Sequence, residues 1–76
     1  MAYIELTSSR SGKRFLANVN KADRFLDEKG DKPNENCYIS GLTNNGGFYI
    51  IETYKEVCDL LYGAGVVIMT KKGVYE

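Results

Sequence analysis

Several residue types that usually carry chemistry are scarce or missing in this sequence of 76 residues. Histidine is absent, and it is the commonest general base and activator of a nucleophile. Cysteine occurs twice, without a Cys-x-x-Cys pair, so no pattern typical of a metal site is present. We therefore expect no catalytic residues, no metal and no cofactor, and an enzyme is the least favoured class of function.

The chain also lacks a long apolar run and a net charge. No apolar stretch approaches the roughly 18 residues that span a bilayer, so we expect no membrane partner. Ten Lys and Arg residues balance ten Asp and Glu residues, which argues against general nucleic-acid binding. Cys37 and Cys58, in a chain without a signal-peptide pattern, predict two buried thiols and a cytoplasmic location. A disulfide or a reactive thiol is the alternative.

The length predicts one domain, 1–76, because two hydrophobic cores would not fit. Domains below roughly 80 residues often gain stability by self-association, and a small sheet with open edges is suited to it. The charge is unevenly distributed. Residues 1–25 carry five cations against two anions, whereas residues 26–60 carry three against seven. Such a surface indicates either a solvated face or an anion-binding patch.

Segment 37–61 is expected to form the centre of the fold. It contains two strands, 37–42 and 48–52, around a turn with Asn-Gly, which is the strongest short-range hairpin signal. Thr53 and Glu56 then fit a capping box at the start of a helix. The apolar residues that follow fall at helical spacing and should share one face: Tyr54, Val57, Cys58 and Leu61. Gly63 would supply the left-handed residue that ends the helix.

The residues before this centre predict a first hairpin and a short third strand. Segments 3–7 and 14–19 alternate in polarity and should pair around a turn at Gly12. Residues 20–26 indicate either one helical turn or, as we favour, a turn followed by a strand at Arg24–Leu26. The charged residues 27–36 should form an exposed, mobile loop.

The C-terminal residues predict one more strand. Residues 66–70 are β-branched and apolar on both faces, which is typical of a buried strand or one that a partner covers. Residues 74–76 would form a short last strand or a frayed end. The prediction is therefore an α+β fold. It comprises a small curved antiparallel β-sheet of about five to six strands in hairpins, one packed helix near residues 54–62, and a C-terminal strand.

Two groups of residues are candidates for binding a ligand. The turn at 8–14 combines serine hydroxyls with the cations Arg10, Lys13 and Arg14, which suits a phosphate group, although a soluble hairpin tip would have the same composition. Tyr38 and Tyr49 should lie on the outer face of the central hairpin. They either fill space between strands or stack on a base.

The C-terminal strand is the candidate for contact with another copy of the chain. Its apolar residues would form an interface, because obligate interfaces are more apolar than ordinary surface. The predicted interface residues are Val66, Val67, Ile68 and Met69. We expect a homo-oligomer.

Parts of the pattern resemble a family of small bacterial and phage-type proteins similar to the flagellar operon protein FlbD. The resemblance covers roughly residues 3–62. It depends on Ile4-Glu5-Leu6-Thr7, Gly12 before Phe15, Asn18, Gly47 before Tyr49-Ile50-Ile51, and Glu52 through Val57. The loop at 27–36 is longer than that family's turn, and residues 66–76 have no counterpart in it. The resemblance implies a related fold and a role without catalysis.

Together these observations predict a small non-catalytic binding protein, of a phage or accessory kind. It would act by occupying a host protein or by assembling with itself through exposed strands. The alternative is that it sequesters a small phosphate-bearing ligand such as a nucleotide, which Arg10, Lys13 and Arg14 would hold while a tyrosine stacks on the base.

Overall fold

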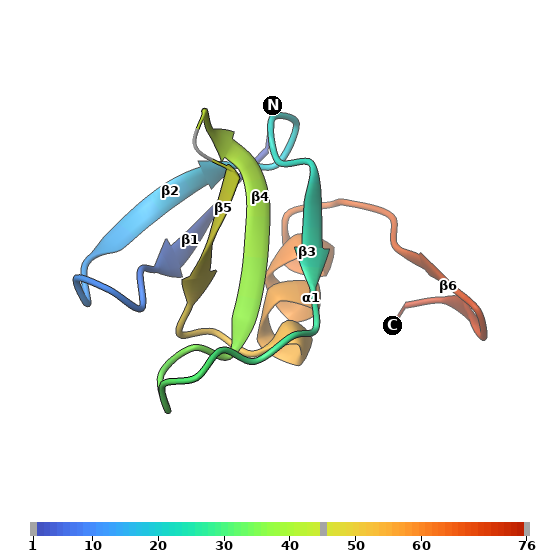
Figure 1. Cartoon of the computed structure of the whole chain (residues 1–76). Helices are drawn as coiled ribbons and strands as arrows, with labels where there is room; N and C mark the ends of the chain where they lie inside the picture. Colours follow the sequence, from blue (N-terminus) through green and yellow to red (C-terminus); the bar gives the residue numbers. More distant parts are fainter. Residues whose placement is uncertain (1, 45, 76) are drawn as a thin grey trace.

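The structure is a computed structural model that describes residues 2–44 and 46–75. Within these residues the chain forms seven strands and one helix (Figure 1). In chain order they are β1 (Tyr3–Thr7), β2 (Arg14–Asn18), β3 (Arg24–Leu26), β4 (Cys37–Thr43), β5 (Gly46–Ile50), α1 (Tyr54–Gly63), β6 (Met69–Thr70) and β7 (Gly73–Val74). Asn45 of the expected Asn-Gly turn and Glu76 of the expected last strand lie outside the described residues.

The first hairpin forms as predicted. β1 and β2 are antiparallel, with Ile4 opposite Ala17 and Leu6 opposite Phe15. Successive side chains of a strand point to opposite faces, so Ile4, Leu6 and Ala17 are buried while Leu16 is 68% exposed. The turn has a left-handed residue at Gly12, with φ of 72°.

The second sheet has the strand order β3-β4-β5, and it confirms the predicted strand at Arg24–Leu26. Ile39 on β4 and Ile50 on β5 have no exposed surface. Tyr38 lies directly opposite Tyr49, and both rings are half-buried. The predicted assignment of isoleucines to the inner face and tyrosines to the outer face is confirmed.

The prediction that the strands form one curved sheet is not confirmed, because they divide into three small sheets. β1–β2 and β3-β4-β5 meet at an isolated bridge between Ser8 and Ile50, just after β1 ends. Hydrogen bonds from Ser9 N to the Tyr49 carbonyl (3.2 Å) and from Ile51 N to the Thr7 carbonyl (3.0 Å) complete this junction. The two sheets meet where β1 and β5 end, so the ladder there is too short to make one continuous sheet.

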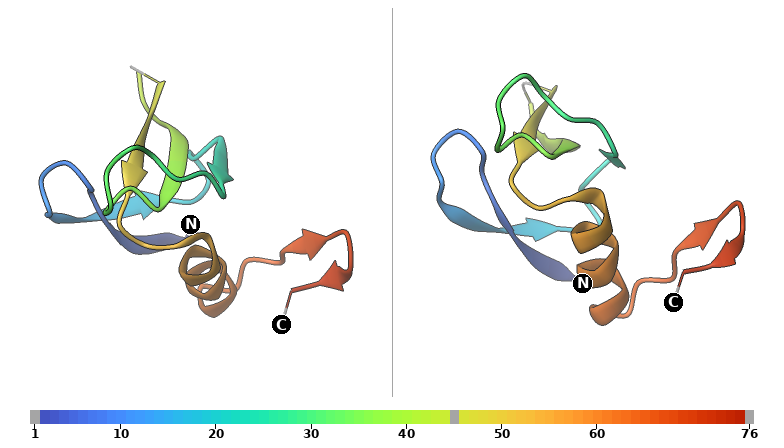
Figure 2. Two further views of the ribbon diagram at one scale, coloured as in Figure 1. Left: turned by 60° about the horizontal axis from the view of Figure 1, so that its bottom comes forward. Right: turned by 90° about the horizontal axis from the view of Figure 1, so that it is seen from below.

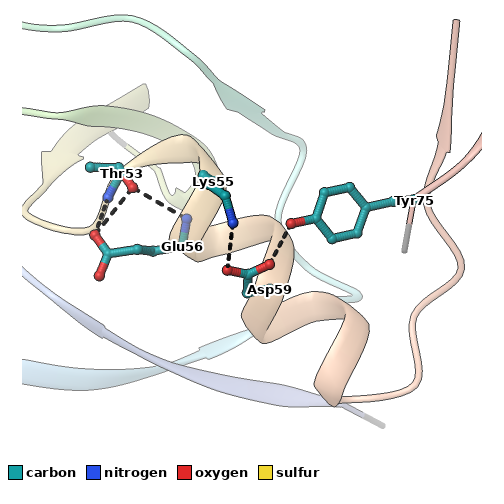
Figure 3. Close-up of polar contacts among 5 residues, drawn as sticks. All are labelled: Thr53, Lys55, Glu56, Asp59 and Tyr75. Atoms are coloured by element: carbon teal, nitrogen blue, oxygen red, sulfur yellow. Dashed lines mark hydrogen bonds and ion pairs between the residues drawn. The ribbon is translucent and has the colours of Figure 1, made fainter. Parts of the chain in front are cut away.

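Helix α1 begins with the predicted capping box, which Figure 3 shows. The Thr53 hydroxyl accepts from Glu56 N at 3.2 Å, and Glu56 Oε1 accepts from Thr53 N at 3.0 Å. The buried face consists of Val57, Cys58 and Leu61. Tyr54, which was also expected on this face, lies at the start of the helix and is 39% exposed. Val57 and Leu61 of the buried helix face close the core over Leu6, Ile39 and Ile50.

The chain leaves α1 differently from the prediction. Gly63 is the last helical residue, and Gly65, with φ of 84°, is the left-handed residue that turns the chain. The strand expected at 66–70 is limited to Met69–Thr70, which pairs with β7. Residues 66–68 are not in a strand, since they have no adjacent strand to pair with. Residues 66–75, which we call the C-terminal arm, extend from the end of α1 away from the two larger sheets (Figure 2).

Candidate ligand-binding site

A cavity of about 700 Å³ lies where the β1–β2 turn meets β4 and β5. This volume is within the range of small-molecule sites, roughly 300–1,000 Å³. Four of its lining residues are aromatic, so we call it the aromatic cavity. It is lined by Ser8, Ser9, Arg10, Phe15, Glu35, Tyr38, Thr43, Gly47, Phe48 and Tyr49.

The β1–β2 turn is fixed against β5 and the segment directly after it by hydrogen bonds on both sides of Ser8. Before it, Thr7 donates from its backbone N to Glu52 Oε1 and from its hydroxyl to Glu52 Oε2, both at 2.8 Å. After it, Ser9 N donates to the Tyr49 carbonyl. The side chains of Ser8, Ser9 and Arg10 are therefore carried on a backbone with few conformational choices.

The tyrosine pair depends on the glycine beside it. The rings of Tyr38 and Tyr49 meet edge to face, with centroids 5.1 Å apart and planes at 69°. The ring of Tyr38 lies against the backbone of Gly47, where a Cβ atom would come within 2.5 Å of Tyr38 Cζ and of the Ile39 carbonyl. A glycine at position 47 thus allows Tyr38 to pack flat across β5.

The loop between β3 and β4 forms another part of the cavity wall. Asn34 donates from Nδ2 to the Ser9 carbonyl at 2.6 Å, and Glu35 Oε1 accepts from Lys32 N at 3.1 Å. The Tyr49 hydroxyl donates to Glu28 Oε1 at 3.4 Å. Partial burial, followed by the charge of Glu28, raises the pKa of Tyr49, so this phenol is protonated at neutral pH and remains a hydrogen-bond donor.

The structure brings together three of the five predicted ligand-binding residues: Arg10, Tyr38 and Tyr49. Lys13 and Arg14 do not line the cavity. The Arg14 guanidinium instead lies 3.9 Å from Glu5 Oε1 across the first hairpin. Arg10 has no ion-pair partner among residues 2–44 and 46–75, so its charge is available to a ligand.

Several lining residues were missed in the sequence. Phe15 and Phe48 approach each other from different hairpins, with ring centroids 5.6 Å apart. Glu35 belongs to the loop that was expected to be only solvated. Gly47 lies opposite Ser40, beside the Tyr38–Tyr49 pair, and this register is a property of the folded sheet; no local pattern marks Gly47 or Glu35 as lining a cavity.

Both cysteines, Cys37 and Cys58, are buried and free, as predicted. Burial raises the pKa of Cys37 to about 11, with a smaller contribution from Asp27. Burial also raises the pKa of Cys58. Both are therefore protonated near neutral pH, and a protonated thiol is a poor nucleophile.

Within the described part of the chain, no three Cys, Asp or Glu residues are grouped so that they could hold a metal ion. No helix among these residues is long and apolar enough to cross a membrane.

The predicted interface residues separate into two pairs. Val66 and Ile68 are half-buried and pack against the core. Val67 and Met69 are 75% and 69% exposed on the C-terminal arm. Alternation within this short segment therefore directs one pair inward and leaves the other pair accessible.

No protein-family model, curated protein or solved structure matches this chain. The resemblance to the FlbD-like family therefore stays a prediction.

Proposed function

We propose that this is a non-catalytic binding protein that holds a small phosphate-bearing ligand, such as a nucleotide, in the aromatic cavity. The observation that carries the proposal is that Arg10 and the Tyr38–Tyr49 pair, far apart in the sequence, line the same cavity. This arrangement favours the ligand hypothesis over occupation of a host protein, which the sequence alone ranked first.

The phosphate would lie beside the β1–β2 turn. Arg10 is exposed and has no ion-pair partner within the described residues, and guanidinium groups form short, charge-assisted hydrogen bonds to phosphate. The hydroxyls of Ser8 and Ser9, which line the same wall, are additional donors. The amides of Ser8 and Ser9 donate to the carbonyls of Lys13 and Tyr49, so the side chains rather than these amides would bind the anion.

The remainder of the ligand would lie over the aromatic residues. Stacking of a base on an aromatic side chain contributes about 1–3 kcal/mol, and the edge-to-face tyrosine pair offers such a ring. Glu35 gives the cavity a carboxylate as well as a cation. A ligand with an anionic group at one end and hydrogen-bond donors at the other, as in a nucleoside monophosphate, matches this polarity better than a polyanion.

Isothermal titration with nucleoside monophosphates, the matching nucleosides and inorganic phosphate tests the proposal. Arg10→Ala should weaken binding of a monophosphate about tenfold or more, because one charge-assisted hydrogen bond is worth about 1.5–3 kcal/mol. It should leave binding of the nucleoside unchanged. Tyr38→Ala should weaken binding of both compounds.

Lys13→Ala is the matched control, since it removes a cation from the same turn but from outside the cavity. It should change the affinity less than twofold. The proposal is wrong if none of the compounds binds at about 1 mM, or if Lys13→Ala and Arg10→Ala have equal effects.

A further inference from the structure

The C-terminal arm carries apolar side chains that the rest of the chain does not cover. Val67, Met69 and Val74 are 75%, 69% and 58% exposed. The arm contains the hairpin β6–β7, with two residues in each strand and no pairing to the other sheets. Isolated two-stranded hairpins are at best marginally stable in water, so an arm of this composition is suited to packing against another surface.

The arm is nonetheless held in one orientation relative to α1. The Tyr75 hydroxyl donates to Asp59, which also lies 3.5 Å from Lys55 Nζ (Figure 3). The ring of Tyr75 meets that of Tyr62 edge to face at 6.2 Å. The hairpin is therefore presented from a fixed base, which lowers the entropy cost of docking it.

A complementary surface exists at the β3 edge of the second sheet. β3 pairs with β4 on one side, and its other side is an edge of that sheet. Edge strands present unpaired N–H and C=O groups that another strand can join. The residues directly after β3, Asp27 and Glu28, are exposed carboxylates. The tip of the arm carries Lys71 and Lys72, which form no ion pair among the described residues.

We propose that the arm of one copy of this chain adds to the β3 edge of a second copy, with β7 antiparallel to β3. Antiparallel alignment sets the start of β7 against the end of β3. Lys72, directly before β7, would then lie beside Asp27, directly after β3. Parallel alignment would instead set Lys72 beside Asp23, a carboxylate that already has Arg24 as its ion-pair partner at 3.4 Å. Reciprocal exchange of the two arms gives a closed two-fold dimer.

This interaction uses none of the residues that line the aromatic cavity, and its one link to the cavity is Glu28, which accepts a hydrogen bond from Tyr49 at 3.4 Å. Its failure would therefore leave the proposed ligand-binding function untouched, and the reverse also holds. The apolar side chains of the arm would supply the burial, while the lysines and carboxylates would select the alignment of the strands.

Light scattering after size exclusion, with the full chain and two charge-reversed variants, tests the proposal. The wild-type chain should have twice the chain mass of 8.5 kDa. Variant one, Lys71→Glu with Lys72→Glu, and variant two, Asp27→Lys with Glu28→Lys, each place like charges at both contacts. Each should dissociate at least about tenfold more readily than the wild type.

Mixing the two variants should restore a dimer with one copy of each, because both contacts then join opposite charges. A chain carrying all four substitutions should dimerise alone. Lys13→Glu with Arg14→Glu, which changes the net charge as variant one does, should leave the wild-type dimer intact. Circular dichroism of each variant checks that it is folded.

A wild-type chain that remains a monomer at about 1 mM overturns the proposal, since the arm then has no second copy as its partner. Variants that dimerise as the wild type does, or a mixture that gains nothing over its components, overturn it equally.

Discussion

The contact between Thr7 and Glu52 provides a quantitative test of how the two larger sheets are joined. Glu52 accepts two hydrogen bonds from Thr7, one to each carboxylate oxygen, across 45 positions of sequence. The substitution Glu52→Ala removes both, and Glu52→Gln keeps the shape of the side chain but removes its charge. Thr7→Val removes only the bond from the hydroxyl.

The expected losses follow from the geometry. Both bonds are 2.8 Å long and partly buried, so each charge-assisted bond is placed at the low end of the range, about 1.5 kcal/mol. Glu52→Ala should then reduce the free energy of unfolding by about 3 kcal/mol. Glu52→Gln can form two neutral bonds of about 1 kcal/mol each and should cost about 1 kcal/mol. A domain of this length has about 4–11 kcal/mol of stability in total, so the alanine variant should be severely weakened.

Urea unfolding, followed by circular dichroism, measures these losses. In thermal unfolding, each kcal/mol lost should lower the melting temperature by about 4–8 °C. Glu5→Ala is the control, because its carboxylate is exposed and lies 3.9 Å from Arg14; it should change stability by less than about 0.5 kcal/mol. In a double-mutant cycle, Thr7→Val and Glu52→Ala should couple by about 1.5 kcal/mol. A loss in Glu52→Ala no larger than that in Glu5→Ala would refute the reasoning.

Two further predictions concern the cavity and the arm. Gly47→Ala should destabilise the fold by about 1–3 kcal/mol and displace Tyr38, with weaker ligand binding, whereas Gly63→Ala, where a Cβ atom meets nothing within 4 Å, should be neutral or stabilising in the same unfolding assay. The contact of Tyr75 with Asp59 raises the pKa of Tyr75 to about 12 and lowers that of Asp59; it should therefore hold between about pH 4 and pH 10, weakening as pH rises through the Tyr75 pKa or falls through that of Asp59. The protection of the arm amides against hydrogen exchange, taken relative to the intrinsic exchange rate at each pH, should show this profile. Tyr75→Phe should have low protection at every pH. Protection that does not change with pH in the wild-type chain would contradict the prediction.

The elements that were predicted correctly depend on local signals. Thr53 and Glu56 are three residues apart, so the capping box is visible in the sequence itself. The alternation around Ile39 and Ile50 also assigns the faces of β4 and β5 without any knowledge of distant residues. The strand at Arg24–Leu26 is short, and its prediction depended on the turn expected directly before it.

The errors arise where distant segments decide the outcome. The bridge between Ser8 and Ile50 joins residues 42 positions apart, and no local pattern says how far that pairing continues. The β-branched run at 66–70 has a high strand propensity, but strand formation requires a neighbouring strand, and the described residues provide one only for Met69–Thr70. For the site, residue type identified suitable cations and aromatics. Only the three-dimensional arrangement separated Arg10 from Lys13 and Arg14.

The narrow junction at Ser8 and Ile50 also has a consequence for how the molecule comes apart. The first hairpin has its own complete ladder, and its backbone is joined to the second sheet only at this short junction, beside the core that the two share. Such a connection is a natural line of sub-global opening, in which the hairpin detaches as a unit while β3-β4-β5 stays paired. Closing it again brings together residues far apart along the chain, which is slow compared with forming either hairpin. The aromatic cavity is lined by residues from both sides of this junction, so a bound ligand would hold the hairpin and the second sheet together and oppose this opening.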